Sequence, residues 1–572
     1  MASFLVGLNP VPSFPDYTGP YKVGTVDVEI PASELLSPSP TPEGAEDLHT
    51  VQFRIFFPGV PEPRGKRITW LPAPQRLHVA AYAQFLGIGS TLASILSFLP
   101  RHLHWTTIPA LKNAALLPPT SDNPRSRWPT MIFSHGLGGH RNAYSHLAGS
   151  LASYGVVVVC PEHRDSSAPL SLVRDPQNQD SLFVKNTRRV VPYSRIPHAQ
   201  THEIWEARNK QLRIRLWELG LILEAITAID RGDEPLTKSN LNKSTPESAL
   251  SQFAGKLDVV DPGRVIFAGH SFGAVTMVQL LKSTYYRAHP SLKAMPSPLF
   301  TPTETSAVAK QITPRNPTIL LDMWCFPLLS ASTAPLYNLP LPCYTPPASP
   351  SPSPPRSPTS ALLAIESAAF FNWSEHLHAK ARILSPSPPA AAAAKQVSRD
   401  AFDRHGRLPK PHFFYVEGSA HLSQSDFGVL FPWLTTGRLF GADRRRLAER
   451  VLRLNVRAQL QFLRENGVAV AGTAKADVLA DGLGVRGGGD GGELAEWVEN
   501  DEGILHGDEG MVSAWKAIDV VGLGDGAYPS ELEMEEKGTD RTEAEVEAAE
   551  REREMEGEIE PSLETAVEGG GR

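Results

Sequence analysis

The stretch Arg264-Val-Ile-Phe-Ala-Gly-His-Ser-Phe-Gly273 decides the fold class. Its first five residues have the apolar composition of a buried strand, and the pattern G-x-S-x-G follows before a helical stretch that begins at Phe272. A serine at this spacing is typical of a strained strand-to-helix turn, because the residues two before and two after it must be small. The sequence therefore predicts Ser271 as a nucleophile, with Gly269 and Gly273 as its small neighbours. The alternative is a glycine turn that only packs a helix on a strand.

Strand and helix patterns alternate on both sides of this turn. The expected strands cover residues 51–57, 131–133, 156–160, 317–321, 361–365 and 412–416. Apolar residues at helical spacing predict helices over residues 212–226 and 447–462. This order predicts an α/β fold with a mostly parallel central sheet flanked by helices.

The composition divides the chain into two parts. Residues 15–467 hold the alternating pattern, interrupted by a Pro- and Ser-rich insertion at about residues 345–358 and an alanine run at 390–394. Residues 468–572 are rich in glycine and acidic residues and have little apolar periodicity. We expect one catalytic domain over residues 15–467 and a largely disordered tail after it.

Charge and cysteine content exclude several classes of protein. The net charge of −7 comes from residues 531–560, which hold 14 acidic and four basic side chains, so the remainder is near neutral and no nucleic-acid partner is expected. The three cysteines, Cys160, Cys325 and Cys343, form no disulfide pattern and no metal-ligand spacing. We expect no metal and no cofactor. The first residues lack the features of a signal peptide, so the expected location is the cytoplasm.

A serine nucleophile needs a base and an acid that orients the base, in the chain order Ser, Asp or Glu, His. Asp322 comes directly after the expected strand 317–321, and His421 lies in a short loop after strand 412–416. Both positions are strand ends at the carboxyl edge of a parallel sheet, so we predict Asp322 as the acid and His421 as the base. Asp426 is the rival acid. The competing histidines, which we expect to be solvated, are His376, His378 and His405.

Two backbone amides are needed to stabilise the negative charge that develops on a substrate carbonyl oxygen. The first is predicted at Phe272, directly after the nucleophile. The second is predicted at Leu137, in the glycine-rich loop His135-Gly-Leu-Gly138 that follows the strand at 131–133. The alternative is that this loop only turns the chain.

Six stretches in the order of the chain resemble one family, the platelet-activating factor acetylhydrolases of the lipoprotein-associated and type II intracellular group. The stretches are Gly19-Pro-Tyr-Lys-Val-Gly24, Phe133-Ser-His-Gly-Leu-Gly138, Glu162-His-Arg-Asp-Ser166, Gly269-His-Ser-Phe-Gly273, Leu321-Asp-Met-Trp-Cys-Phe-Pro-Leu328 and Gly418-Ser-Ala-His421. The resemblance covers residues 15–467 and implies an α/β-hydrolase fold.

The resemblance implies calcium-independent hydrolysis of the sn-2 ester in phospholipids with a short or oxidised acyl chain. It also implies the residues reached from spacing: Ser271, Asp322, His421, Leu137 and Phe272. Two alternatives stay open: a general carboxylesterase or lipase of the same fold, and a non-catalytic hydrolase fold that serves as an interaction protein.

The uncharged run from Val79 to Leu99 has the apolar pattern of an interfacial helix. We expect it to hold the protein peripherally on a membrane or lipid surface. The predicted docking residues are Phe85, Ile88, Leu92 and Leu96. A helix packed on the sheet is the alternative.

Overall fold

The structure, a computed structural model, describes most of the chain in ten ranges. These are residues 12–97, 101–119, 125–174, 188–345, 361–389, 412–435, 442–481, 496–501, 503–506 and 512–518. The expected insertion at 345–358 and the alanine run at 390–394 lie almost wholly outside the described residues.

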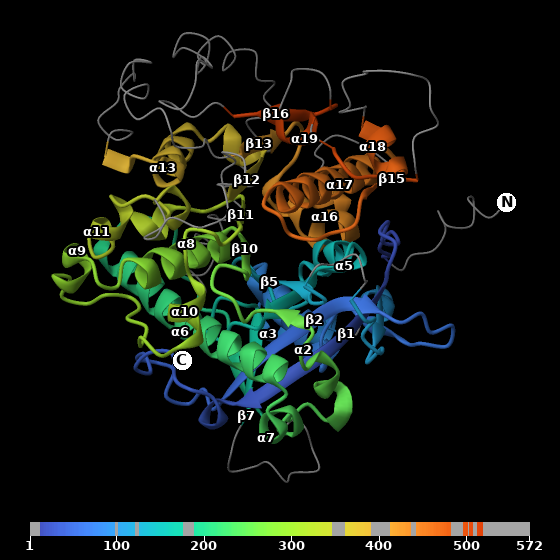
Figure 1. Ribbon diagram of the computed structural model, residues 1–572, viewed down its shortest axis with the longest axis horizontal. Coiled ribbons are helices and arrows are strands. Elements are labelled where there is room, and N and C mark those ends of the chain that lie inside the picture. Colours follow the sequence, from blue (N-terminus) through green and yellow to red (C-terminus); the bar gives the residue numbers. More distant parts are fainter. Residues whose placement is uncertain are drawn as a thin grey trace, which may run out of the picture.

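One twelve-stranded sheet runs through the molecule (Figure 1). Its strand order is β16 (Trp515–Ala517), β13 (His412–Val416), β12 (Leu362–Ser367), β11 (Thr318–Leu321), β10 (Ile266–His270), β5 (Trp128–Ser134), β6 (Val157–Pro161), β2 (Thr50–Gly59), β1 (Lys22–Pro31), β4 (Thr107–Lys112) and β3 (Arg67–Thr69). The short β9 (Leu257–Asp258) pairs with β5 away from this path. The six strands from β13 to β6 are parallel, and β2 and β16 pair with their neighbours antiparallel. The six strands expected from sequence are all present, and the chain has an α/β-hydrolase fold.

Helices cover both faces of this sheet. One face carries α6 (His202–Arg231) and α8 (Phe272–Tyr285), and the other carries α5 (Ser145–Ser153) and α17 (Ala442–Glu465). The two helices expected from sequence are α6 and α17. The remaining helices are α2 (Gln75–Phe85), α3 (Ser90–Leu96), α4 (Arg101–Trp105), α7 (Glu234–Lys238), α9 (Pro290–Lys293), α10 (Ala307–Gln311), α11 (Ala334–Tyr337), α12 (Ala368–Phe371), α13 (Ser374–Leu384), α16 (Asp426–Leu430), α18 (Lys475–Asp481) and α19 (Gly503–His506). The short strands outside the main sheet are β7 (Leu170–Arg174), β8 (Arg188–Pro192), β14 (Thr473–Ala474) and β15 (Trp497–Val498).

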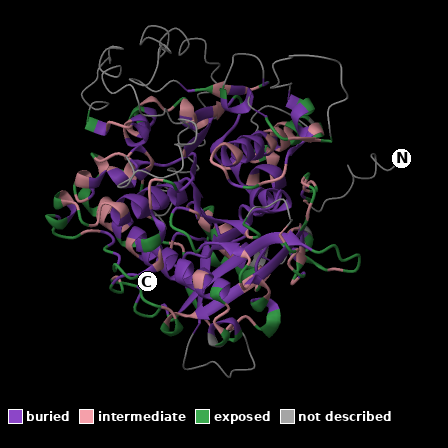
Figure 2. Cartoon of the chain, viewed as in Figure 1, coloured by how far each residue is buried: buried purple, intermediate pink, exposed green. Residues whose placement is uncertain are grey.

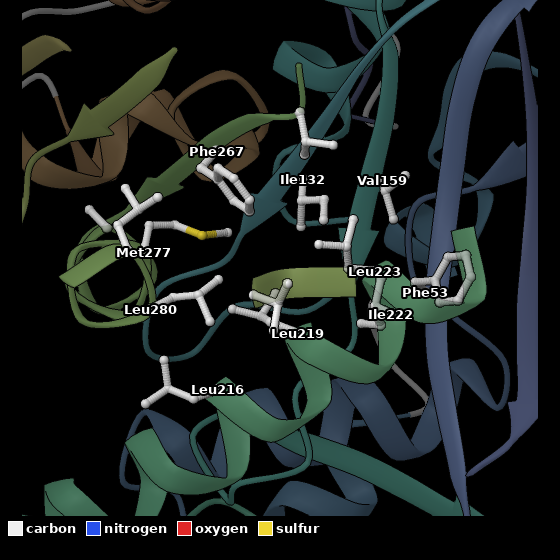
Figure 3. Close-up of a cluster of buried hydrophobic side chains, with 14 of the residues drawn as sticks. Phe53, Ile132, Val159, Leu216, Leu219, Ile222, Leu223, Phe267, Met277 and Leu280 are labelled. Atoms are coloured by element: carbon white, nitrogen blue, oxygen red, sulfur yellow. The ribbon is translucent and has the colours of Figure 1, made fainter. Parts of the chain in front are cut away.

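Successive side chains of a strand point to opposite faces of the sheet, so the core has two layers, one on each face. Ile132 of β5 packs in the cluster that contains α6 and α8, whereas its neighbours Met131 and Phe133 pack in the cluster that contains α5 and α17. Figure 3 shows the first layer, where Leu216, Leu219, Ile222 and Leu223 of α6 face the strands and α8. Since both faces are covered, the central strands are buried along their length (Figure 2).

The described residues after Gly467 belong to this core, which corrects the predicted boundary of a disordered tail. Strand β16 pairs antiparallel with β13, and Trp515 is 4% exposed with its ring stacked on Phe414. The fully buried Arg457 of α17 donates to both carboxylate oxygens of Asp501. A buried guanidinium without its carboxylate partner is strongly destabilising, so the described residues between 468 and 518 are part of the fold. The acidic residues 531–560 lie outside the described residues.

Candidate active site

Ser271 occupies the turn between β10 and α8 with φ of 55° and ψ of −120°. This conformation is rare for a residue with a side chain, and the surrounding fold must hold it. A Cβ atom on Gly269 would lie 2.5 Å from the carbonyl carbon of Gly273, and one on Gly273 would lie 2.0 Å from the Ser134 oxygen. Both positions therefore require glycine because backbone approaches them, which explains the G-x-S-x-G spacing.

The next strand of the sheet places Asp322 beside this turn. The Ser271 N–H donates to the Leu321 carbonyl oxygen at 2.9 Å, and Asp322 follows Leu321 directly. His421, the first residue of the 3₁₀ helix η8 (His421–Gln424), has its Nδ1 3.0 Å from Asp322 Oδ2. The other oxygen, Oδ1, accepts the Ser367 N–H at 2.6 Å. Because Asp322 binds Nδ1, the Nε2 atom of His421 is free to take a proton.

Two rings fix the orientation of the His421 imidazole. Phe370 stacks on it at 4.3 Å between centroids and an angle of 7°, and His270 stacks at 4.4 Å. Within the described residues, no hydrogen bond joins Ser271 Oγ to His421. In enzymes without substrate this contact is often long and tightens in the complex.

Burial sets the protonation states of the pair. Burial raises the pKa of Asp322 to about 6, and the Lys380 charge acts in the opposite direction. Burial, followed by the Lys380 charge, lowers the pKa of His421 to about 3. At neutral pH the imidazole is therefore uncharged and able to accept a proton, while the carboxylate is ionised.

A second buried acid lies next to Asp322, and sequence reasoning missed it. Glu366, on β12, forms an ion pair with Lys380 of α13, and both side chains are 1% exposed or less. Burial, together with the Asp322 charge, raises the pKa of Glu366 to about 8, while the Lys380 charge acts in the opposite direction. The Lys380 ammonium also lies 4.6 Å from the Phe370 ring centroid, so it touches the ring that stacks on His421.

The loop at residues 135–138 lies against the nucleophile. A Cβ atom on Gly136 would lie 3.0 Å from the Cβ of Ser271. Within the described residues, the backbone N–H groups of Leu137 and Phe272 make no hydrogen bond. Phe272 is the first residue of α8, where a free N–H is expected. The structure thus brings both predicted amides to the turn with their donors available.

The competing residues have other roles. Asp426 accepts hydrogen bonds from the Ser145 and His146 N–H groups and from Trp70 Nε1, so it ties α16 to α5. His376 is fully buried, with Nε2 accepting the Cys325 N–H at 2.9 Å, so the expectation that it is solvated is wrong. Because α13 packs on the sheet, its apolar face carries His376 inward. His378 is exposed, and His405 lies outside the described residues.

The segment predicted as one docking helix is two helices, α2 and α3, because Gly87 between them adopts φ of 88°. Phe85 points inward, against the prediction. Its ring lies 4.7 Å from Tyr193, and a Cβ atom on Gly138 would lie 2.9 Å from it. Phe85 therefore covers the glycine loop and is only half exposed.

The other three predicted docking residues differ among themselves. Leu92 is 54% exposed and Ile88 is half-buried, whereas the side chain of Leu96 lies outside the described residues. Leu86, which was not predicted, is 59% exposed. No helix in the described ranges has the length and apolar composition needed to span a membrane.

Two other features bear on ligands. Among the described residues, His270, Asp322 and His421 are the group of possible metal ligands that lie close enough together, and two of them are the predicted acid and base. A cavity of about 480 Å³ lies between the 31–50 segment and α6, lined by residues that include Leu48, Arg174 and Trp217. It contains none of the predicted site residues.

Comparison with known proteins identifies relatives of this chain. A relative from Schizosaccharomyces pombe named "Putative phospholipase A2" is 29% identical over 472 residues, which cover 81% of this chain and 94% of that protein. The platelet-activating factor acetylhydrolases of Cavia porcellus and Bos taurus are 28% and 29% identical, over 47% and 40% of this chain. The matches cover 52% and 46% of those two proteins, so the chain spans about half of their length. The family model described as platelet-activating factor acetylhydrolase, isoform II, matches residues 6–341, and the chain therefore belongs to this family.

Proposed function

We propose that this protein is a calcium-independent serine esterase that cleaves the sn-2 short acyl ester of platelet-activating factor or of similar oxidised phospholipids. One observation carries the proposal: Ser271 sits in a strained turn beside a His421–Asp322 hydrogen bond and two amides that make no hydrogen bond to the described part of the chain. The family, and the names of its acetylhydrolase and phospholipase relatives, support a lipid ester as the substrate.

In the proposed reaction, Ser271 Oγ attacks the ester carbonyl carbon while His421 Nε2 accepts the hydroxyl proton. The Leu137 and Phe272 N–H groups donate to the resulting oxyanion. Collapse of the tetrahedral intermediate breaks the bond to the lysophospholipid oxygen, which takes the proton from His421. Water, deprotonated by the same imidazole, then hydrolyses the acyl-enzyme. Asp322 holds the Nδ1 proton throughout.

The burial of the nucleophile and of the base favours a short acyl group. Ser271 is only 6% exposed and His421 only 9%, and Phe370 packs directly on the imidazole. These exposures support the acetyl or short-chain preference over a general lipase, which must admit a long chain.

The test compares purified wild type with Ser271→Ala and His421→Ala on short-chain sn-2 phospholipids and on p-nitrophenyl esters. Each substitution should lower kcat by several orders of magnitude, because the members of a triad act as a unit. Retention of more than a few per cent of activity by folded Ser271→Ala would reject the mechanism. An inactive wild type would favour the interaction-protein alternative.

We further propose that α2 and α3 hold the cytoplasmic enzyme peripherally on lipid through Leu86 and Leu92. These apolar side chains are mostly exposed, and the two helices pack on each other. Tyr82 of α2 donates to the Gly138 carbonyl at 3.3 Å, so this surface adjoins the glycine loop of the site.

Liposome co-sedimentation of Leu86→Glu and Leu92→Glu tests this surface. Both should bind less than wild type, because a charge replaces apolar area at the interface. Leu36→Glu is the matched control, since Leu36 is 53% exposed elsewhere on the molecule. Equal binding by all four proteins would reject α2 and α3 as the docking surface.

A further inference from the structure

The motif Glu162–Ser166 has no part in the proposed reaction. It binds a buried arginine, Arg215, which also contacts the glycine loop and Phe272, the two parts of the proposed oxyanion site. Arg215, in the middle of α6, is fully buried. Its Nε donates to Asp165 Oδ2 at 2.7 Å, so the Asp165 carboxylate of this motif is its counter-ion. The other two guanidinium nitrogens remain to bind other groups.

One of these nitrogens holds the glycine loop. Arg215 Nη1 donates to the carbonyl oxygen of His135 at 2.7 Å. Nη2 donates to Ser167 Oγ at 2.6 Å, and the backbone carbonyl of Ser167 accepts the Gly138 N–H at 2.8 Å. Arg215 therefore contacts the start of the loop directly and its end through Ser167.

Further contacts fix the backbone on both sides of Leu137. The Gly136 N–H donates to Tyr144 Oη at 3.3 Å, and the Gly136 carbonyl accepts His135 Nδ1 at 2.8 Å. With Gly138 held by Ser167, the peptide groups on both sides of Leu137 are fixed, and the Leu137 N–H makes no hydrogen bond to any residue that the structure describes. The loop is therefore held in one orientation before any substrate arrives.

The same guanidinium also touches the other half of the site. The Arg215 carbon Cζ lies 4.6 Å from the centroid of the Phe272 ring, within the range of a cation–π contact. Phe272 is fully buried and supplies the second amide. A planar guanidinium can bind a carboxylate, a hydroxyl, a carbonyl and a ring face at once, which an ammonium group cannot.

We propose that Arg215 is a positioning residue that fixes the Leu137 and Phe272 amides relative to each other, so that both point at the oxyanion. This inference rests on the proposed serine-esterase function. Arg215 contacts no substrate atom in this scheme. It acts on the transition state through the two amides, whose stabilising effect depends on geometry set in advance.

The test uses Arg215→Lys in the full-length protein, with p-nitrophenyl acetate as substrate and a trifluoromethyl ketone as probe, since the ketone forms an anionic tetrahedral adduct with the serine. Loss of one oxyanion donor costs about 10²–10³-fold in kcat. Displaced donors should cost about 10–100-fold, with KM changed by less than about twofold. The inhibition constant of the ketone should rise by the same factor as kcat falls.

The matched control is Arg457→Lys, which alters another fully buried arginine whose carboxylate partners are Asp481 and Asp501. It should lose stability but keep the wild-type kcat and ketone affinity. Asp165→Asn is the second variant, because it removes the charge that pairs with Arg215 without changing the side-chain size. Asp165→Asn should show a smaller fall in kcat and an equal, smaller rise in the inhibition constant of the ketone.

Folded Arg215→Lys with kcat within twofold of wild type would overturn the inference, as would a fall in kcat with unchanged ketone affinity. If both Arg215→Lys and Asp165→Asn fail to fold while Arg457→Lys folds, Arg215 is structural and the inference is rejected. Failure of the proposed function gives a different result, namely an inactive wild type or an active Ser271→Ala.

Discussion

Replacing Trp515 by alanine measures how far the C-terminal strand belongs to the catalytic fold. Trp515 is 4% exposed, stacks on Phe414 at 5.0 Å and donates its indole N–H to the Ile504 carbonyl at 2.7 Å. Truncation of a buried tryptophan or phenylalanine costs about 3–5 kcal/mol. The total free energy of unfolding is about 5–15 kcal/mol for a domain, so the expected loss is a large fraction of it.

Equilibrium unfolding in urea, followed by far-ultraviolet circular dichroism and by residual esterase activity, measures the change. Both signals should show the loss, because β16 pairs with β13, and His421 follows β13 in the chain. Trp433→Ala is the control: Trp433 is 60% exposed, so its removal should change stability by less than about 0.5 kcal/mol. A loss below about 1 kcal/mol for Trp515→Ala would refute the conclusion that β16 is part of the core.

Four further results are expected. The value of kcat/KM should fall on the acid side with a midpoint near pH 6, because burial raises the pKa of Asp322 to about 6 and a protonated carboxyl no longer stabilises the imidazolium. Lys380→Met should move that midpoint to higher pH, because the Lys380 charge lowers the Asp322 pKa. The control is Lys282→Met, which removes a buried lysine bound to the Leu336 and Leu339 carbonyls and should leave the midpoint unchanged. An unmoved midpoint in Lys380→Met would contradict the assignment of the acid-side midpoint to Asp322. EDTA should leave the activity unchanged, and a loss restored by calcium would disprove calcium independence. A chain that ends at residue 467 should be inactive or insoluble, whereas one that ends at residue 518 should stay active; equal activity would show that the segment between them is dispensable.

The elements predicted correctly from sequence are those fixed by local constraints. The two glycines around Ser271 are required by contacts with Gly273 and with Ser134 on the neighbouring strand, and their spacing is visible in five residues. The continuous apolar strands are visible because both faces of the sheet are covered. Given these strands, the ends of β11 and β13 predict that Asp322 and His421 lie on the same edge of the sheet.

The elements that were missed depend on distant contacts. Strand β16 has only three residues, which is too short for a periodic pattern to predict it. Its position comes from pairing with β13 and from the Trp515 contacts. The single helix expected over residues 79–99 is broken because Gly87 takes a left-handed conformation, for which glycine has no steric penalty. An isolated glycine in an apolar pattern can be tolerated in a helix, and only the tertiary structure shows that this one is not.

The buried charges around the site form a third group. The positions of these charged residues within their helices indicate burial, although the overall composition does not. Leu212, Arg215 and Leu219 are spaced by three and four residues, so Arg215 lies on the apolar stripe of its helix and cannot reach solvent. Lys380 lies in the same way between Leu377 and Ile383 in α13. A charged residue at an apolar position must be paired, because an unpaired buried charge is too costly. Its partners here, Asp165 and Glu366, each lie beside a part of the proposed active site. The motifs therefore mark the groups that we propose to react, whereas charged residues on apolar helix faces mark the groups that we propose to hold them.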